Sequence, residues 1–143
     1  MVFGFVYLID NKMINRLLFK ERFSYFDKKI VVEIIDIFIE EYDERIIKLT
    51  QFIKDQNLDD FRKAVHAFKG VMANFDQECL AYQKIVLMHH QASRLFDEIL
   101  AGRVLNQDDS AAFFRSMTKE FEIFKPSSLE MLNDLKTIRT NYL

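Results

Sequence analysis

The sequence predicts an all-α protein, and we expect an antiparallel four-helix bundle with a short N-terminal helix or arm. Apolar residues recur at spacings of three and four through most of the chain, which is the period of an amphipathic helix. The 143 residues include only 3 glycines and 1 proline, so few positions favour tight turns. With 50% hydrophobic residues, the chain can bury one core between long helices joined by short loops.

The length predicts a single domain over residues 1–143, with an N-terminal extension over 1–27 and a bundle over about 28–140. The first ten residues, MVFGFVYLID, lack a cationic region and a cleavage site, and they are too few to span a bilayer. We expect them to pack on the bundle as a strand-like or short helical arm, or else to face a partner. Residues 10–21 then predict a short amphipathic helix, with apolar residues at Met13, Ile14, Leu17 and Leu18.

Two longer helices are expected next. The first covers about 28–55 and follows Asp27, a candidate N-cap. Its apolar face comprises Val31, Ile34, Ile35, Phe38, Tyr42, Ile46, Leu49 and Phe52. The polar segment DQNLDD then interrupts the pattern, and Asn57 is the candidate N-cap of a helix over about 58–75. The inner face of that helix comprises Phe61, Ala64, Val65, Phe68, Met72 and Phe75.

Two further helices complete the expected bundle. One covers about 78–101, with Gly102 as a candidate C-cap. Its inner face comprises Ala81, Ile85, Met88, Ala92, Leu95 and Ile99. The last begins near Asp108, and its apolar register continues through Pro126, which predicts one kinked helix rather than two. Its inner face comprises Phe113, Met117, Phe121, Phe124, Ser128, Met131, Leu135 and Ile138.

Composition and missing motifs exclude several classes of function. A net charge of −2 and a pI of about 5.9 provide no basic excess for nucleic-acid or membrane-surface binding. The single cysteine, Cys79, cannot form an internal disulfide, and we expect a packed, inert thiol in a cytoplasmic protein. The adjacent pair His89 and His90 diverge by about 100° on a helix, so we expect no metal site. Without a Gly-rich phosphate loop or an ATP-binding signature, any phosphate must come from a partner.

One segment carries a chemical pattern: AVHAFKGVMANF, residues 64–75. His66 follows the inner residue Val65 by about 100° of helical rotation, which places it at the edge of the core with access to solvent. Lys69 and Arg62, three residues after and four residues before it, reach the same space. Gly70 leaves that space open, although a mid-helix glycine costs about 0.5–1 kcal/mol relative to alanine.

This arrangement suits a phosphoryl group on the imidazole of His66. Neutral imidazole is a nucleophile near neutral pH, because its ordinary pKa is about 6.5. The phosphorylated ring carries about two negative charges, so it needs nearby cations and room. A histidine near a lysine is also common on ordinary helices, and glycine also permits close helix packing, so spacing alone leaves a purely structural role open.

The segment HAFKG, His66 to Gly70, resembles the H-x-[LF]-K-G signature of histidine-containing phosphotransfer (HPt) domains. In that family the signature lies on the second helix of a four-helix antiparallel bundle, after a long helix and a short polar turn. The resemblance covers about residues 10–138 and is strongest around the signature. The sequence is thus similar to this family both in the short motif and in the order of its predicted helices.

The resemblance implies that His66 is the phospho-acceptor, taking its phosphoryl group from a receiver-domain aspartate and passing it to another receiver. Lys69, Gly70 and Arg62 would stabilise or accommodate the phosphate. The chain would be a monomeric phosphocarrier of a multistep two-component phosphorelay, without kinase activity of its own. It would need no cofactor, because the receiver supplies Mg²⁺. Its partners would be a response-regulator receiver domain, a hybrid sensor histidine kinase or both, on a surface that includes Lys63, Ala67 and Ala73.

The sequence departs from the family pattern after the signature. Val71 and Met72 replace small residues, and Phe75-Asp76 stand where Leu-Gly is usual, which leaves the end of that helix and its turn open. These departures support an alternative, a helical adaptor that binds a receiver or kinase without carrying phosphate. An exposed His66 beside Lys69 would favour phosphotransfer, whereas a buried, hydrogen-bonded His66 would favour the adaptor.

A second departure concerns the next helix. HPt domains often place a glutamine or similar polar residue there, which hydrogen-bonds near the active histidine. The aligned position in this sequence is Met88, which cannot do so. Gln91, His89 or His90 can take that role only if the register shifts, and the sequence assigns it to none of them.

Overall fold

The computed structural model describes residues 14–143, and every regular element within that range is helical. The helices are α2 (Arg16–Arg22), α3 (Lys28–Lys54), α4 (Leu58–Ala73), α5 (Leu80–Leu100) and α6 (Gln107–Thr140). The all-α prediction is therefore confirmed for the described residues. The four expected long helices are all present, with ends that differ by only one or two residues from those predicted.

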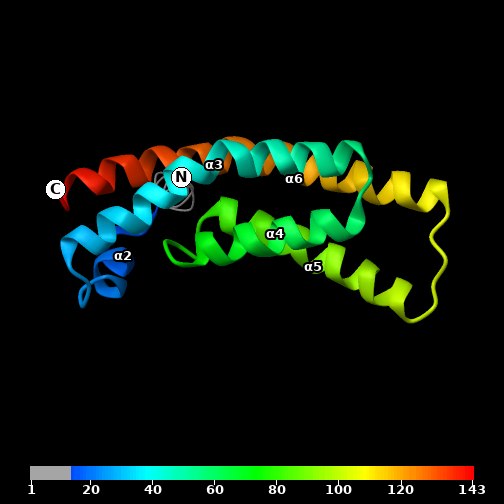
Figure 1. Ribbon diagram of the computed structural model, residues 1–143, viewed down its shortest axis with the longest axis horizontal. Coiled ribbons are helices and arrows are strands. Elements are labelled where there is room, and N and C mark those ends of the chain that lie inside the picture. Colours follow the sequence, from blue (N-terminus) through cyan, green and yellow to red (C-terminus); the bar gives the residue numbers. More distant parts are fainter. Residues whose placement is uncertain (1–13) are drawn as a thin grey trace, which may run out of the picture.

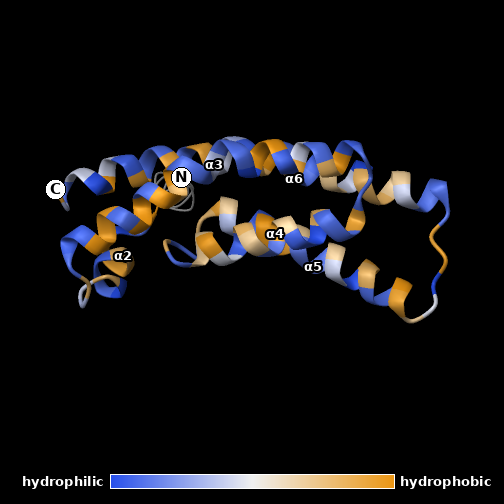
Figure 2. Ribbon diagram, in the orientation of Figure 1, coloured by the Kyte–Doolittle hydropathy of each residue, from blue (hydrophilic) through white to orange (hydrophobic). Residues whose placement is uncertain are grey.

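The four long helices pack as a bundle (Figure 1). α3 and α6 lie side by side along the long axis, α4 packs on α3 and α5, and α5 also packs on α6. Figure 2 shows apolar and charged residues alternating along each helix, which is the pattern of helices with one buried face. None of the helices over residues 14–143 combines the length and the apolar run that crossing a bilayer requires.

Phe68 of α4 lies at the centre of the packing. Its ring is fully buried, and it meets aromatic rings from two neighbouring helices. The ring centroids of Phe38 and Tyr42 in α3 each lie 6.2 Å from that of Phe68, and the centroid of Phe124 in α6 lies 5.3 Å away. Burial of one such ring stabilises the fold by about 1.5–3 kcal/mol, so these contacts fix the rotational setting of α4.

α6 runs without a break through Pro126, so the prediction of one helix rather than two is confirmed. Proline cannot donate to the carbonyl of residue 122, but both positions are exposed, and water can replace the missing bond. Close to the proline, the hydroxyls of Tyr42 and Ser128 lie 2.6 Å apart across the α3–α6 contact. At the start of α6, Phe114 rather than the predicted Phe113 is buried, whereas Phe113 packs at the margin of the core.

Three of the sequence signals for helix ends can be compared with the structure. The side chain of Asn57 accepts a hydrogen bond from the backbone N–H of Asp60 at 3.1 Å, as its N-cap prediction requires. Gly102 follows α5 with φ +108°, a conformation that favours glycine, so its role as a helix terminator is confirmed. Asp27 does precede α3, but its side chain makes no capping hydrogen bond, so that part of the prediction is wrong.

The turn between α4 and α5 is closed by two buried residues that the family pattern lacks. Phe75 is 2% exposed and stacks on the aromatic core, and Asp76 is 5% exposed. One carboxylate oxygen of Asp76 accepts hydrogen bonds from the backbone N–H groups of Glu78 at 2.6 Å and Cys79 at 2.9 Å. The other accepts from the N–H of Asn15 at 2.7 Å. The Phe-Asp pair therefore builds a structured turn at the point that the sequence left open.

The N-terminal segment docks through a second buried carboxylate. Asp134 of α6 accepts a hydrogen bond from the N–H of Ile14 at 2.9 Å and pairs with the guanidinium of Arg16. That pairing is the main reason why the pKa of Arg16 is raised. A short helix is present, but it begins at Arg16, after Ile14 and Asn15, and not near residue 10 as predicted. Leu17 and Leu18 are 66% and 40% exposed, so the predicted apolar face is wrong at these two positions. The expected arm over residues 1–13 lies outside the described residues.

Cys79 lies in the core at the start of α5, with 1% of its surface exposed. Burial raises the pKa of the thiol to about 11, which outweighs the hydrogen bonds from nearby backbone N–H groups. Burial and a raised thiol pKa both disfavour the reactive thiolate. The predicted packing of the thiol is confirmed, and its inertness stays a prediction.

Replacement of Asp76 tests how much the turn contributes to stability. Asp76→Ala leaves three backbone N–H groups without their acceptor, and we expect the free energy of unfolding to fall by about 2–3 kcal/mol. Asp76→Asn keeps one carbonyl oxygen and should lose less. Urea unfolding would measure both, with Asp97→Ala on the exposed surface of α5 as the control. An Asp76→Ala chain that unfolded at the same urea concentration as the wild type would contradict this role.

Candidate functional site

His66 lies in the middle of α4 and points away from the core. Phe61, Val65, Phe68 and Met72 form the buried face of this helix, and each is 0% exposed. Because His66 follows Val65 by about 100° of rotation, its side chain emerges beside the buried face. His66 is exposed, as the sequence predicted.

Gly70 lies one turn after His66 on the same face of α4, and it is exposed. A methyl group built at its Cα would meet no atom within 4 Å. Close packing of a neighbouring helix therefore does not explain the glycine. The open space beside His66 is a feature of the surface itself.

His89 of α5 faces His66 across the α4–α5 contact. The ring centroids of the two imidazoles lie 4.9 Å apart, with 39° between the ring planes. Lys69 joins this pair, because its Nζ lies 2.8 Å from Nδ1 of His89. The structure thus brings together an exposed imidazole, a half-buried imidazole and an ammonium group at the edge of two helices.

The contact between Lys69 and His89 is compatible with one tautomer of His89 when Lys69 is an ammonium group. An ammonium group has only donors, so Nδ1 must accept, and the single ring proton lies on Nε2. His89 is neutral in this arrangement. Its pKa is lowered, first by burial, then by the positive charge of Lys69 and by the proximity of His66, Arg62 and His90.

Arg62 and Lys63 make contacts that the sequence did not specify. The guanidinium of Arg62 lies 3.9 Å above the ring centroid of Phe96 and 2.7 Å from a carboxylate oxygen of Asp59. Lys63 binds the other oxygen of Asp59 at 3.1 Å, and 64% of its side chain is exposed. Arg62 is therefore held one turn before His66, while Lys63 remains on the open surface.

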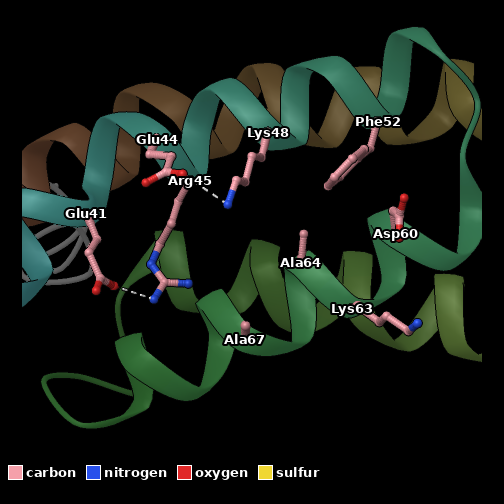
Figure 3. A pocket seen from close by; sticks show the side chains of 9 residues that line it. All are labelled: Glu41, Glu44, Arg45, Lys48, Phe52, Asp60, Lys63, Ala64 and Ala67. Atoms are coloured by element: carbon pink, nitrogen blue, oxygen red, sulfur yellow. Dashed lines mark hydrogen bonds and ion pairs between the residues drawn. The ribbon is translucent and has the colours of Figure 1, made fainter.

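Ala67 lies on the opposite side of His66 from α5 and lines a groove between α3 and α4 (Figure 3). The groove has a volume of about 480 Å³. Its lining comprises Glu41, Glu44, Arg45, Lys48, Phe52, Asp60, Lys63, Ala64 and Ala67. Two ion pairs run along α3 on its side of the groove, Arg45 with Glu41 at 2.7 Å and Lys48 with Glu44 at 3.1 Å. The predicted surface residue Ala73 lies at the other end of α4, where its carbonyl accepts a hydrogen bond from Arg22.

Sequence reasoning left the α5 residue nearest to His66 unassigned. Met88, at the aligned position, is fully buried, and the next residue, His89, reaches His66 instead. The signal was present in the α5 pattern, because Ile85, Met88 and Ala92 occupy the inner face and leave position 89 at its margin. What the pattern could not supply was the axial register of α5 against α4.

Comparison of the chain with protein-family models, with curated proteins and with solved structures finds no match. Within residues 14–143, no three His, Cys, Asp or Glu side chains lie close enough together to hold a metal ion. The groups at this site are the imidazole of His66, which can act as a nucleophile, the imidazole of His89 and the ammonium group of Lys69, with open space at Gly70.

Replacement of Gly70 tests whether the glycine is needed for the stability of α4. Since nothing occupies the space where a Cβ would lie, Gly70→Ala should raise the free energy of unfolding by about 0.5–1 kcal/mol through helix propensity alone. Urea unfolding of the variant and the wild type would measure the change. A loss of stability would mean that the backbone at Gly70 is constrained in a way that the structure does not show.

Proposed function

We propose that the chain is a histidine phosphotransfer protein of a multistep phosphorelay, a phosphocarrier without kinase activity of its own. The observation that carries the proposal is the exposed imidazole of His66, with the unfilled space at Gly70 one turn away and Lys69 on the same edge of α4. A nucleophile, room for a phosphoryl group and a cation are what such a carrier needs. The antiparallel four-helix arrangement of HPt domains is part of the same proposal.

The reaction proposed for this site is a reversible transfer of a phosphoryl group between a carboxylate oxygen of the receiver aspartate and an imidazole nitrogen of His66. The lone pair of an imidazole nitrogen of His66 forms an N–P bond, the P–O bond to the receiver aspartate breaks, and the aspartate leaves as a carboxylate. Charge spreads over the phosphoryl oxygens in the transition state, so positioning and cations provide most of the catalysis. The partner receiver would supply Mg²⁺, and Lys69 would bind the phosphoryl oxygens from the α4 side.

The partner would be a receiver domain, alone or within a hybrid sensor kinase. It would approach His66 over the exposed Ala67 and the α3–α4 groove, where Lys63 and the ion pairs of α3 present charges of both signs. Such charges favour one partner over another and speed encounter. A cytoplasmic location and a monomeric state belong to this proposal.

An adaptor that binds a receiver without carrying phosphate is the alternative. One observation favours it, since Lys69 is already engaged by His89 rather than free beside His66. The two functions differ in one result, because an adaptor would bind the receiver and acquire no phosphate.

Phosphoryl transfer to the purified chain tests the proposal directly. Incubation with a phosphorylated receiver domain and Mg²⁺ should label the wild type with a phosphate that is labile in acid and stable in base. His66→Gln should abolish the label and leave the fold intact, because the side chain is exposed.

His90→Gln is the matched control, since His90 is an exposed histidine on α5 and should leave labelling unchanged. Label that persisted on His66→Gln would place the acceptor elsewhere. A folded wild-type chain that bound the receiver but never acquired label would establish the adaptor instead.

Lys69 offers a second test. Lys69→Met keeps much of the aliphatic volume but removes the charge that would stabilise the phosphoryl group, so the rate of transfer should fall roughly 10- to 100-fold. Lys63→Met removes a surface charge that acts on encounter, so with the receiver at saturating concentration it should change the rate of the transfer step far less. Rapid-quench measurement with one receiver would compare the two, and equal rates would show that Lys69 does not contact the phosphate.

A further inference from the structure

The contact between Lys69 and His89 places one cation within reach of two competing partners. Lys69 and His66 lie three residues apart on the same face of α4, and His89 lies beside both from α5. In the resting chain the ammonium group donates to the neutral ring of His89. A phosphoryl dianion on His66 would be the stronger acceptor, because its charge is opposite to that of the ammonium group, whereas the ring of His89 carries no net charge.

We propose that His89 is a positioning residue that couples phosphorylation of His66 to proton uptake, because the phosphoryl group draws Lys69 away and leaves His89 free to bind a proton. The proposal rests on the phosphotransfer function and specifies how that site is regulated. The proton comes from solvent, since His89 is only half-buried. Protonated His89 would then be a second cation facing the phosphate.

The charged groups around His89 support this coupling. From α4 they are Lys69, His66 and Arg62, and from α5 itself the neighbour His90. On the α5–α6 side, Glu120 binds Lys84 at 2.9 Å and is not among the groups that shift the pKa of His89. The groups that act on His89 are therefore cationic or able to become so, and together with burial they lower its pKa in the resting chain. A phosphoryl dianion on His66 would act in the opposite direction, because a negative charge nearby favours the protonated form of His89.

The direction of the pH dependence follows from linkage. If the phosphorylated chain binds a proton at His89 more tightly, then a lower pH favours the phosphorylated chain by the same factor. The effect is confined to the pH window between the pKa values of His89 in the two states. Within it, uptake of one full proton shifts the transfer equilibrium by up to about tenfold per pH unit.

The decisive experiment measures the equilibrium constant for transfer from one phosphorylated receiver between pH 5.5 and 8. Three full-length chains are compared: wild type, His89→Gln and His90→Gln. Glutamine at position 89 keeps an oxygen that can accept from Lys69 but cannot titrate, so its curve should be flatter than that of the wild type. His90→Gln removes only the weakest of the influences on His89, so its curve should stay much closer to that of the wild type. The same receiver is used in all three measurements, so its own pH dependence cancels in the ratio.

A second measurement needs no phosphate. The chain has only 3 histidines, so ¹⁵N-imidazole NMR can follow each ring through a pH titration. Lys69→Met should raise the pKa of His89, because the neighbouring charge is removed, whereas Lys63→Met should not. An unchanged pKa in Lys69→Met would overturn the Lys69–His89 contact and the proposal with it.

The outcomes distinguish the two proposals. Label on the wild type with the same pH dependence in His89→Gln would overturn the coupling and leave phosphotransfer standing. No label on the wild type would overturn phosphotransfer, and with it the coupling, whatever the NMR titration showed. Label with a flatter curve for His89→Gln alone, and a raised pKa in Lys69→Met, is the expected result.

Discussion

The site depends on the buried face of α4. Phe68 is enclosed by rings from α3 and α6, and the other residues of that face, one turn away in each direction, are buried equally well. A helix anchored in this way cannot rotate without exposing aromatic surface, so the adjacent stripe is held outward. The exposure of His66 is a consequence of that packing, and no hydrogen bond of its own is needed to maintain it.

The long helices were predictable because each has one continuous apolar face, and in α6 the register of that face continued past Pro126. The short α2 was less predictable. With only 7 residues its period is poorly defined, and its docking depends on Asp134, a residue far along the chain. The error at Leu17 and Leu18 arises there, since a buried carboxylate that binds a backbone N–H and a guanidinium has no periodic signal.

The candidate site likewise combines features that the sequence predicts with one that it does not. The exposure of His66 and the space at Gly70 follow from positions within one helix, which spacing describes well. His89 reaches the site through the register of α5 against α4, and this register depends on the turn in which Phe75 and Asp76 are buried. Periodicity along α5 alone does not specify which of its residues stands opposite the histidine.

Cys79 has a practical consequence for the study of this surface. The sequence contains a single cysteine, and in the folded chain its sulfur is inaccessible and protonated. A cysteine introduced at an exposed position such as Ala67 would therefore be the only thiol that reacts with a spin label or fluorophore. The approach of a partner to the α3–α4 groove can then be followed spectroscopically in a chain that keeps its natural core.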